Sequence, residues 1–370
     1  MLRKPFSAIS GLILALSFAC GFVQSVQAVN ADQTTNKVTC TAEQGQALID
    51  EGRFKDAIRI FSCVIDDQPT EIEGYRGRME AALMLGSFSD AVGDFSRLTA
   101  YALPLHPDAE DIIMDGYAAR LALASDDIVA LTGASFTRWC FFHYPKAIHL
   151  VNQLLEVDPD GLYGNLFRGS SRLLQGVNVK EGKADLERAI GFAPESAGVH
   201  FIVADAYTYG PFDPQRAFYE ASLALQLGLD TPRIHAILAS SYIAFGDLLS
   251  AADHIQTHID YVTSELLPTP SLAAWESLDL YFVPGRTYEI PIPIVSGQAV
   301  SILTASPSHD IWDSIMVLLD EDGTPVIGND DFSGYLAGFE DWVAAETGTY
   351  HMRVTTFESV STGQLVVSRD

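Results

Sequence analysis

Basic residues and long hydrophobic runs are both scarce in this sequence. Lysine and arginine together number 22, against 48 aspartate and glutamate residues, and the formal net charge is −26. A charge of this sign repels phosphate backbones, so we expect no nucleic-acid partner. After residue 28 no segment offers the ~20 consecutive apolar residues that a membrane-spanning helix needs, so we expect no membrane span. Because 48% of the residues are hydrophobic, the chain can still bury sizeable cores, which we expect in two units.

The main apolar run, residues 11–23, has the layout of a cleavable signal peptide. It follows the basic pair Arg3 and Lys4 and precedes the small-residue cleavage site at Ala28. An alternative is a lipoprotein signal ending at Cys20, but Phe18 stands where such signals carry a small residue. The sequence therefore predicts that residues 1–28 are removed and that the rest of the chain is secreted, periplasmic or in the cell envelope. Removal of Arg3 and Lys4 leaves a net charge of −28.

A short phrase recurs along the first two thirds of the chain. Gly52–Ala57 followed by Phe61 is matched 34 residues later by Gly86–Ala91 followed by Phe95, and Gly246–Ala251 repeats the phrase again. A fixed period of this length is typical of stacked helical hairpins, because one hairpin cannot bury its apolar stripe alone. Two positions of the second helix in each hairpin, which we call the small slot and the large slot, are expected to contact the neighbouring helices. The small slot holds Ala57, Ala91, Ala147, Gly182, Ala217 and Ala251, and the large slot holds Phe61, Phe95, Val151 and Leu186.

Residues 38–265 thus resemble the tetratricopeptide-repeat family, and the resemblance implies an all-α superhelical solenoid. Pro69, Pro159 and Pro194 are expected to end second helices, since proline cannot donate a helix hydrogen bond. The period slips over residues 106–145, where we expect either an insertion or an irregular hairpin. Five regular repeats and one irregular repeat are predicted.

Three cysteines remain after residue 28, namely Cys40, Cys63 and Cys140. The repeat pattern places Cys40 at the start of one helix and Cys63 near the end of its antiparallel partner. An exported chain meets oxidising conditions, so we predict a disulfide between these two residues. Cys140 is then expected to be a buried free thiol.

The amino-acid composition changes at a predicted linker, residues 266–271. Helix formers give way to β-branched and aromatic residues with glycine and proline between them, which predicts an all-β domain over residues 272–370. The expected strands are Leu278–Val283, Thr287–Ile294, Gln298–Thr304, Ser314–Leu319, Tyr350–Thr356 and Gly363–Ser368. Many short strands with regular turns favour an antiparallel sandwich.

Three segments of this domain, Asp313–Gly323, Gly328–Asp331 and Glu346–Val354, resemble the bacterial pre-peptidase C-terminal domain. The resemblance implies a jelly-roll-like β-sandwich that contributes to secretion, stability or binding to surface polymers, with calcium in some members. Carboxylate and amide oxygens are the hard ligands that calcium prefers. The candidate calcium ligands are Asp313, Asp320, Asp322, Asn329, Asp330 and Asp331. The alternative is that Asp320–Gly323 is only a hairpin turn.

No zinc-protease pair, serine elbow or phosphate loop is present. His254 and His258 stand one turn apart and could share a metal. However, His258 falls in a slot that holds apolar residues in other repeats, which favours a packed structural histidine. Ser170-Ser171 lacks the strand that a nucleophile turn needs, and we interpret it as a small-residue helix contact.

These observations favour an exported, non-enzymatic scaffold whose repeat groove binds a protein or peptide. By their place in the repeats, the predicted partner contacts are Arg76, Glu80, Tyr163, Ser170 and Arg233. A first alternative is a degenerate or unrecognised secreted hydrolase with its site hidden in residues 106–145, at Trp139 or His143. A second is that the β-sandwich binds a cell-surface glycan, other polymer or protein while the solenoid acts as a spacer. No cofactor is predicted apart from calcium.

Overall fold

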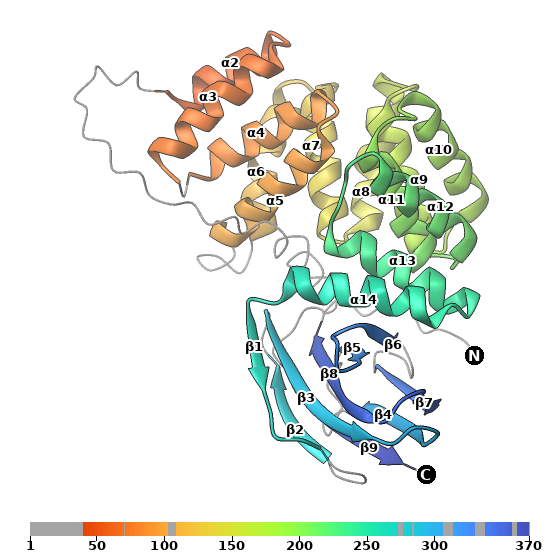
Figure 1. Ribbon diagram of the computed structural model, residues 1–370. Helices are drawn as coiled ribbons and strands as arrows, with labels where there is room; N and C mark the ends of the chain where they lie inside the picture. Colours follow the sequence, from red (N-terminus) through yellow and green to blue (C-terminus); the bar gives the residue numbers. More distant parts are fainter. Residues whose placement is uncertain are drawn as a thin grey trace. The chain divides into compact units, whose positions relative to one another are not determined.

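The computed structural model describes residues 40–69, 71–102, 109–272, 277–282, 285–305, 314–329, 337–356 and 361–369 (Figure 1). The predicted signal peptide lies outside these residues. The chain divides into two compact units, unit 1 ending at Pro211 and unit 2 beginning at Phe212. Among the described residues, no helix is both long and apolar enough to cross a bilayer.

The repeat region is helical, with a tetratricopeptide-like order of helices. Unit 1 contains α2 (Ala42–Asp50), α3 (Phe54–Asp67), α4 (Ile72–Met84), α5 (Phe88–Ala102), α6 (Ala109–Leu123), α7 (Ile128–Cys140), α8 (Tyr144–Val157), α9 (Leu162–Gln175), α10 (Val179–Phe192) and α11 (Ala197–Tyr209). Unit 2 begins with α12 (Pro214–Gln226), α13 (Pro232–Phe245) and α14 (Leu248–Val262). In unit 1, α2 packs on α3, α4 on α5, α7 on α8 and α9 on α10, and in unit 2 α13 packs on α14.

The two predicted slots of the second helices form the contacts between helices. The small-slot residues are buried, and so are the large-slot residues. Phe61 of α3 shows how the slots work, because its ring lies against Gly45 of α2 and Gly77 of α4. A Cβ atom added at Gly77 would lie 2.1 Å from Phe61 Cζ, and one at Gly45 would lie 2.5 Å from it. Small residues on the first helices therefore make room for the large residue of the second helix.

The recurring glycines form the turns between the two helices of a hairpin. Gly52, Gly86 and Gly246 have φ values of 72°, 78° and 79°, in the left-handed region where a side chain costs energy. The next helix starts within two residues of each glycine, at Phe54, Phe88 and Leu248. The phrase that recurs with a 34-residue period is thus a turn followed by the first turns of a second helix.

The irregular stretch 106–145 contains an additional helix. α6 lies in sequence between the α4/α5 and α7/α8 hairpins, and it packs against α7. α7 is buried on all sides over residues 130–137, which is unusual for a surface helix and indicates that neighbours cover it all round. Of the two predicted alternatives for this stretch, the structure shows an insertion, and the hairpin that follows it has a regular order.

The C-terminal strands form two sheets in unit 2. They are β1 (Glu265–Pro268), β2 (Ser277–Phe282), β3 (Arg286–Ile294), β4 (Ala299–Ala305), β5 (Ser314–Leu319), β6 (Pro325–Asn329), β7 (Gly338–Val343), β8 (Gly348–Thr356) and β9 (Ser361–Arg369). One sheet has the order β1-β3-β8-β5-β6 and the other β2-β9-β4-β7. The first is mixed, because β1 runs parallel to β3. All six predicted strands are confirmed, and β1, β6 and β7 are additional.

Both sheets contribute to one hydrophobic core. Leu280 of β2 and Ile302 of β4 come from one sheet, and Ile290 of β3, Met316 of β5 and Met352 of β8 come from the other. We call these strands the two-sheet domain. A jelly-roll-like sandwich remains a prediction for it.

β5 is buried on both faces, which explains why its sequence does not alternate. Met316 and Leu318 point into the core between the sheets. Ile315, Val317 and Leu319 instead pack with residues of α13 and α14. Figure 1 shows α14 beside β5 and β6, and a Cβ atom added at Gly328 of β6 would lie 3.1 Å from Ile255 Cδ1 of α14. The last repeat helix therefore covers one face of the five-stranded sheet.

The first residues of the predicted linker, residues 266–271, belong to a strand. Two residues separate the end of α14 from β1, which pairs with β3 from Glu265 to Pro268. Beyond it, the amides of Thr269 and Leu272 donate to the carbonyls of Glu289 and Pro291. The linker was predicted because the segment contains Pro268 and Pro270. At a sheet edge, however, a residue without an N–H can still belong to a strand.

Candidate functional site

The five predicted partner contacts lie on α4, α9 and α13. Glu80 on α4 and Ser170 on α9 are buried, whereas Arg76, Tyr163 and Arg233 are half-buried. The structure brings Arg76 and Glu80 together, with Arg76 Nε 3.7 Å from Glu80 Oε1. Elsewhere on these helices, the Ser170 hydroxyl donates to the carbonyl of Phe167, and the Tyr163 ring stacks on the Phe167 ring. Their proposed role as direct partner contacts stays a prediction.

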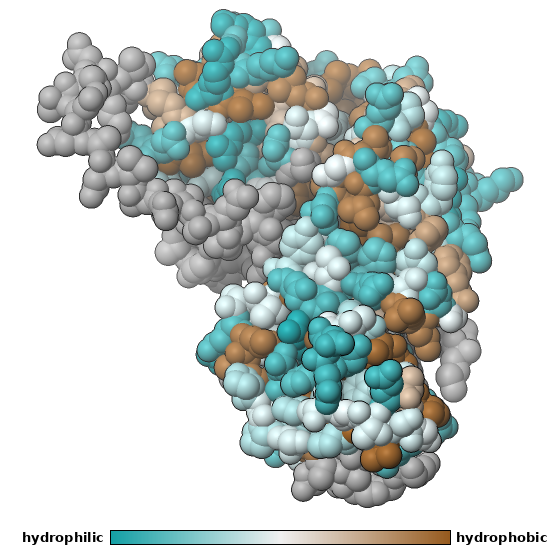
Figure 2. All heavy atoms as spheres, viewed as in Figure 1, coloured by the Kyte–Doolittle hydropathy of each residue, from teal (hydrophilic) through white to brown (hydrophobic). Residues whose placement is uncertain are grey.

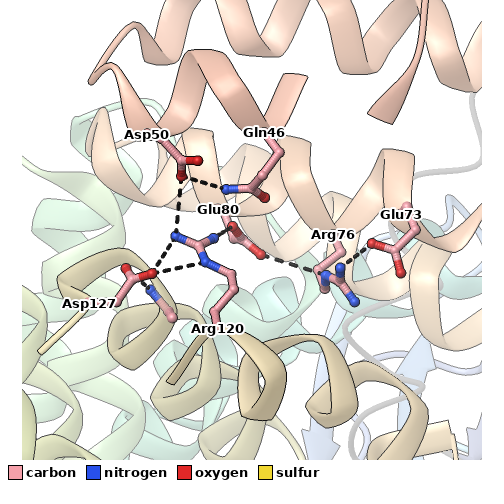
Figure 3. Close-up of polar contacts among 8 residues, drawn as sticks. Gln46, Asp50, Glu73, Arg76, Glu80, Arg120 and Asp127 are labelled. Carbon is pink, nitrogen blue, oxygen red and sulfur yellow. Dashed lines mark hydrogen bonds and ion pairs between the residues drawn. The ribbon is translucent and has the colours of Figure 1, made fainter. Parts of the chain in front are cut away.

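Arg120 of α6 is the centre of a charge network that we call the Arg120 cluster, made of Asp50, Arg76, Glu80, Arg120 and Asp127 (Figure 3). Arg120 Nη1 donates to Glu80 Oε2 at 2.8 Å, and Arg120 Nη2 lies 2.8 Å from Asp127 Oδ2. Asp50 at the end of α2 is 3.9 Å away. Asp127 also accepts a hydrogen bond from the Ala130 amide and so caps α7. One guanidinium thus connects α6 to α2, α4 and α7.

Glu80 is fully enclosed by this cluster. Burial raises the pKa of Glu80 to about 7, although the positive charges of Arg120 and Arg76 act against this rise. Burial also lowers the pKa of Arg120, but Glu80 and Asp127 more than offset that effect, so the pKa of Arg120 is raised. A buried carboxyl group with this pKa is half-protonated near neutral pH, and its attraction for Arg120 therefore depends on pH.

Tyr117 anchors the middle of α6. Its side chain is completely buried and lies against Gly133 of α7, where an added Cβ atom would be 2.6 Å from the tyrosine hydroxyl oxygen. The Arg76 guanidinium stands 5.8 Å from the centre of the Tyr117 ring. Gly116 leaves room for Arg76, because a Cβ atom there would overlap with it. α6 therefore meets α4 and α7 through closely fitted side chains.

A second set of charges holds the first turn of α6. Glu110 pairs with Arg138 of α7 and lies 2.7 Å from Nδ1 of His143, which follows α7. Glu110 and Arg120 are close to the two ends of α6, and both reach residues of other helices. The helix is thus fixed at its start, middle and end.

The helices that α6 reaches through Tyr117 and its charged side chains, α2, α4 and α7, are all first helices of hairpins. In unit 1 the first-helix face therefore already holds a helix of its own chain. An amphipathic helix on such a face is a recurrent mode of peptide recognition, in which apolar anchors and a few charged pairs fix the register. The sequence did not reveal this contact, since α6 falls where the 34-residue period slips.

Buried polar residues that were not predicted stand three positions after the small slot in several hairpins. Asp94, Asp185 and Glu220 are buried at this position, and His254 occupies it in the last hairpin. Two of the acids tie the helices of a hairpin together. Arg78 of α4 makes two hydrogen bonds to Asp94, at 2.8 and 2.6 Å, and Arg168 of α9 makes two to Asp185, both at 2.8 Å. The recurring spacing from the small slot was a signal that could have identified these residues.

His254 and His258 do not face a common site. His254 Nδ1 lies 2.8 Å from His235 Nδ1, whereas His258 Nδ1 lies 2.9 Å from the carbonyl oxygen of Pro232. Asp230 binds the other nitrogen of His235 at 2.9 Å. Burial lowers the pKa of His258 to about 4, as expected for a packed histidine. Among the described residues, the structure has no group of three or more histidine, cysteine or acidic side chains arranged to hold a metal.

Half of the predicted calcium ligands can be located. Asp320 and Asp322 lie in the turn between β5 and β6, and Asn329 is the last residue of β6. Asp320 Oδ1 accepts hydrogen bonds from the amides of Asp322 and Thr324, at 3.0 and 2.8 Å. These bonds are the ones expected of a hairpin turn. Asp313, Asp330 and Asp331 lie outside the described residues, so calcium binding stays a prediction.

The cysteines among the described residues are either paired or buried. A disulfide joins Cys40 to Cys63, the pairing that the sequence predicts, with their Cα atoms 5.9 Å apart. Cys140 is a buried free thiol, and burial raises its pKa well above the ordinary value. Trp139, one of the two residues considered for a hidden hydrolase, packs in the core against Phe136 and Phe167.

On the face shown in Figure 2, hydrophobic residues form separate groups among hydrophilic ones. The most exposed large hydrophobic residues of unit 2 include Tyr219 and Leu249, on α12 and α14. Scattered exposure of this kind is ordinary for a protein surface.

No family model and no curated protein matches the chain. Similar solved structures include a tetratricopeptide repeat protein from Parabacteroides merdae, with a TM-score of 0.38, 14% identity and coverage of 60% of this chain and 78% of that one. A thermophilic tetratricopeptide protein from Thermus thermophilus has a TM-score of 0.34, 15% identity and coverage of 55% and 97%. The pre-peptidase C-terminal domain of a collagenase from Bacillus anthracis has a TM-score of 0.24 and 14% identity, and covers 28% of this chain and 95% of its own. At these scores, the assignment of the hairpin stack rests on the helices themselves.

Proposed function

We propose that this chain is an exported, non-enzymatic scaffold that binds a protein or peptide partner through its helical repeats. The observation that carries the proposal is α6, which packs on the first helix α7 and reaches the first helix α4 through side chains, with Tyr117, Glu110 and Arg120 as its anchors. A face that holds one helix with buried anchors and charged pairs has the shape and chemistry to hold another such segment further along the repeats.

Export is supported by the signal-like N-terminus and by the disulfide between Cys40 and Cys63, since such bonds persist in oxidising compartments. The absence of enzymatic activity is supported by the buried state of Cys140 and by the hydrogen bond from the Ser170 hydroxyl to a backbone carbonyl. Neither side chain is placed as an activated nucleophile would be. Both observations argue against the hydrolase alternative.

The two-sheet domain is proposed to stabilise the end of the repeats, because Ile315, Val317 and Leu319 of β5 pack with α14. Binding of calcium or of a cell-surface polymer remains a further proposal for this domain. A calcium-dependent rise in the melting temperature of the purified chain, lost in Asp313→Ala, would support a metal site. An unchanged melting temperature at about millimolar calcium would argue against it.

In-cell photo-crosslinking tests the scaffold proposal. A photoreactive amino acid is placed singly at Arg233 on a first helix, at Arg59 on a second helix, and at Val295 in the two-sheet domain. Arg59, whose side chain is 77% exposed, and Val295, which is 59% exposed, are surface controls that are more accessible than the half-buried Arg233. A discrete protein adduct from Arg233 that is absent from both controls is the expected result.

Two other results would count against the proposal. Adducts from Val295 alone would make the two-sheet domain the binding end and the repeats a spacer. The absence of a discrete adduct at all three positions in the producing cell would remove the basis for a protein scaffold. The adducts are identified by mass spectrometry after affinity purification.

A further inference from the structure

Three arginines meet at one buried carboxylate between α9 and α10. Arg168 makes two hydrogen bonds to Asp185, from Nε and Nη2, both at 2.8 Å. Arg172 Nη1 lies 2.7 Å from Asp185 Oδ2, and Arg188 Nη1 lies 3.1 Å from Oδ1. We call these four residues the Asp185 arginine cluster. Arg168 and Arg172 are mostly buried, and the Arg188 side chain is 59% exposed.

The cluster carries more positive charge than Asp185 neutralises. Three guanidinium groups face one carboxylate, and every ion pair that these arginines make within the described residues is to Asp185. The other two acids of α10, Glu181 and Glu187, are exposed. Residues 162–192 contain five basic and three acidic residues, in a chain whose net charge is −26. This hairpin is thus a cationic site on a strongly anionic protein.

The corresponding position of an earlier hairpin shows that a structural tie does not need three arginines. Asp94 is held by two short bonds from Arg78, and the other arginine, Arg97, is 3.6 Å away. At Asp185, Arg168 alone makes the same pair of bonds. Arg172 and Arg188 are additional to this pair of bonds. Arg188 has a counterpart in Arg97 but lies closer to its aspartate, at 3.1 Å against 3.6 Å, whereas Arg172 stands where the earlier hairpin has Ala82. Like charges at this separation repel each other unless an anion lies between or beside them.

The additional arginines still have donors for such an anion. A guanidinium offers five N–H groups in a planar fork that matches a carboxylate. Arg172 and Arg188 each use one nitrogen on Asp185, which leaves Nε and the second terminal nitrogen of each. Asp185 holds the guanidinium groups in place, so little side-chain entropy remains to be lost when a ligand binds.

We propose that the Asp185 arginine cluster binds a carboxylate of an acidic peptide segment, as a contact site for a protein partner. The guanidinium forks suit carboxylates and phosphoryl groups alike. The overall negative charge favours a ligand of small charge, because each further negative charge adds repulsion from the rest of the chain. A peptide carboxylate fits this requirement better than a polyphosphate or a nucleic acid. The site is separate from the Arg120 cluster, and its test does not depend on the proposed scaffold function.

The test measures binding of an eight-residue peptide with one glutamate among neutral residues, amidated at its C-terminus and labelled with an uncharged dye, to the chain without residues 1–28. Binding is followed by fluorescence anisotropy at low ionic strength. We expect saturable binding that becomes about tenfold weaker or more in Arg172→Gln and in Arg188→Gln, the effect of losing a charge-assisted hydrogen bond. Arg97→Gln is the matched control, since Arg97 is also a half-exposed arginine three residues after a buried aspartate. It should bind as the unchanged chain does.

Three results would overturn the proposal. The first is absence of saturable binding, and the second is equal weakening in Arg97→Gln, which would indicate non-specific attraction. The third is displacement of the peptide by inorganic phosphate at lower concentration than by acetate, which would assign the site to phosphoryl groups. Because Arg188 is exposed, Arg188→Gln should keep the melting temperature of the unchanged chain, and it separates loss of binding from loss of fold.

Discussion

Single buried charges distinguish this hairpin stack from a purely apolar one. Asp94 and Asp185 are each held by an arginine from the first helix of the same hairpin, and Glu80 is held by Arg120 of the inserted helix. Removing one partner of such a pair leaves an unpaired charge in the interior, which costs more than the pair itself contributes. These residues therefore specify which helices come together.

Glu80→Gln should remove part of the pH dependence of unit 1 stability. The folded chain holds the Glu80 proton up to a pKa of about 7, above the ordinary value of 4.5. The contribution of the Glu80 proton to the free energy of unfolding is fully present below pH 4.5 and is lost as the pH rises through about 7. The total loss is roughly 3 kcal/mol. Urea unfolding of both proteins at about pH 5 and about pH 8 measures this difference. The same pH slope in both proteins would contradict it.

Arg120→Ala should destabilise unit 1 strongly. The substitution leaves Glu80 and Asp127 without their short bonds, which are 2.8 Å each, at a cost of about 3 to 5 kcal/mol. Arg97→Ala is the control, because this half-exposed arginine lies 3.6 Å from its acid and should cost about 0.5 kcal/mol or less. Chemical denaturation gives both values, and similar losses in the two variants would refute the special role of Arg120.

At the scale of helices and strands, the sequence was informative wherever a local rule repeats. Ala57 and Phe61 indicate the two slots of a second helix. The apolar run Ser314–Leu319 indicates a strand, and its lack of alternation is typical of one buried on both faces. α6 was not predicted, because no period marks its contacts, and one of its main partners, Glu80, lies 40 residues before Arg120. β7 was missed since Asp341 has a φ of 53° and interrupts the alternation of the strand.

The candidate site was predicted only in part. Arg76 and Glu80 were selected by repeat position, and the structure does bring them together. Their partner Arg120 lies in the stretch without a period, so the buried network could not be deduced from spacing. The buried acids at Asp94 and Asp185 do follow a spacing rule, three residues after the small slot.

At the scale of the whole molecule, the two units are expected to respond to acid in opposite directions. Burial lowers the pKa of His258 in unit 2 to about 4, from an ordinary 6.5. The contribution of His258 to the free energy of unfolding is present above pH 6.5 and is lost as the pH falls through about 4. The contribution of Glu80 to the stability of unit 1 instead increases on acidification. Calorimetry should show the unit 2 transition moving down in temperature from about pH 7 to about pH 4.5, and His258→Leu should reduce that movement. A transition that moves equally in His258→Leu would contradict the assignment.

A fragment comparison tests where the second unit begins. The fragment 212–370 keeps α14 over Ile315, Val317 and Leu319, whereas 268–370 exposes these side chains and lacks most of β1. We expect 212–370 to melt in one cooperative step and 268–370 to bind a hydrophobic dye and melt at lower temperature. Equal melting temperatures would place the boundary at the end of the helices.

The position of β9 in its sheet has a consequence for the order of folding. This strand comes last in the chain but is an inner strand, paired with β2 on one side and β4 on the other. Its partner β2 must therefore wait for about 80 further residues before the pairing can form, while the repeats ahead of it close through short-range contacts. During synthesis, the four-stranded sheet can therefore be completed only after β9 has emerged. Until then, the apolar edges of β2 and β4 would be open to proteases and chaperones, so that a truncated chain would be degraded before it accumulated.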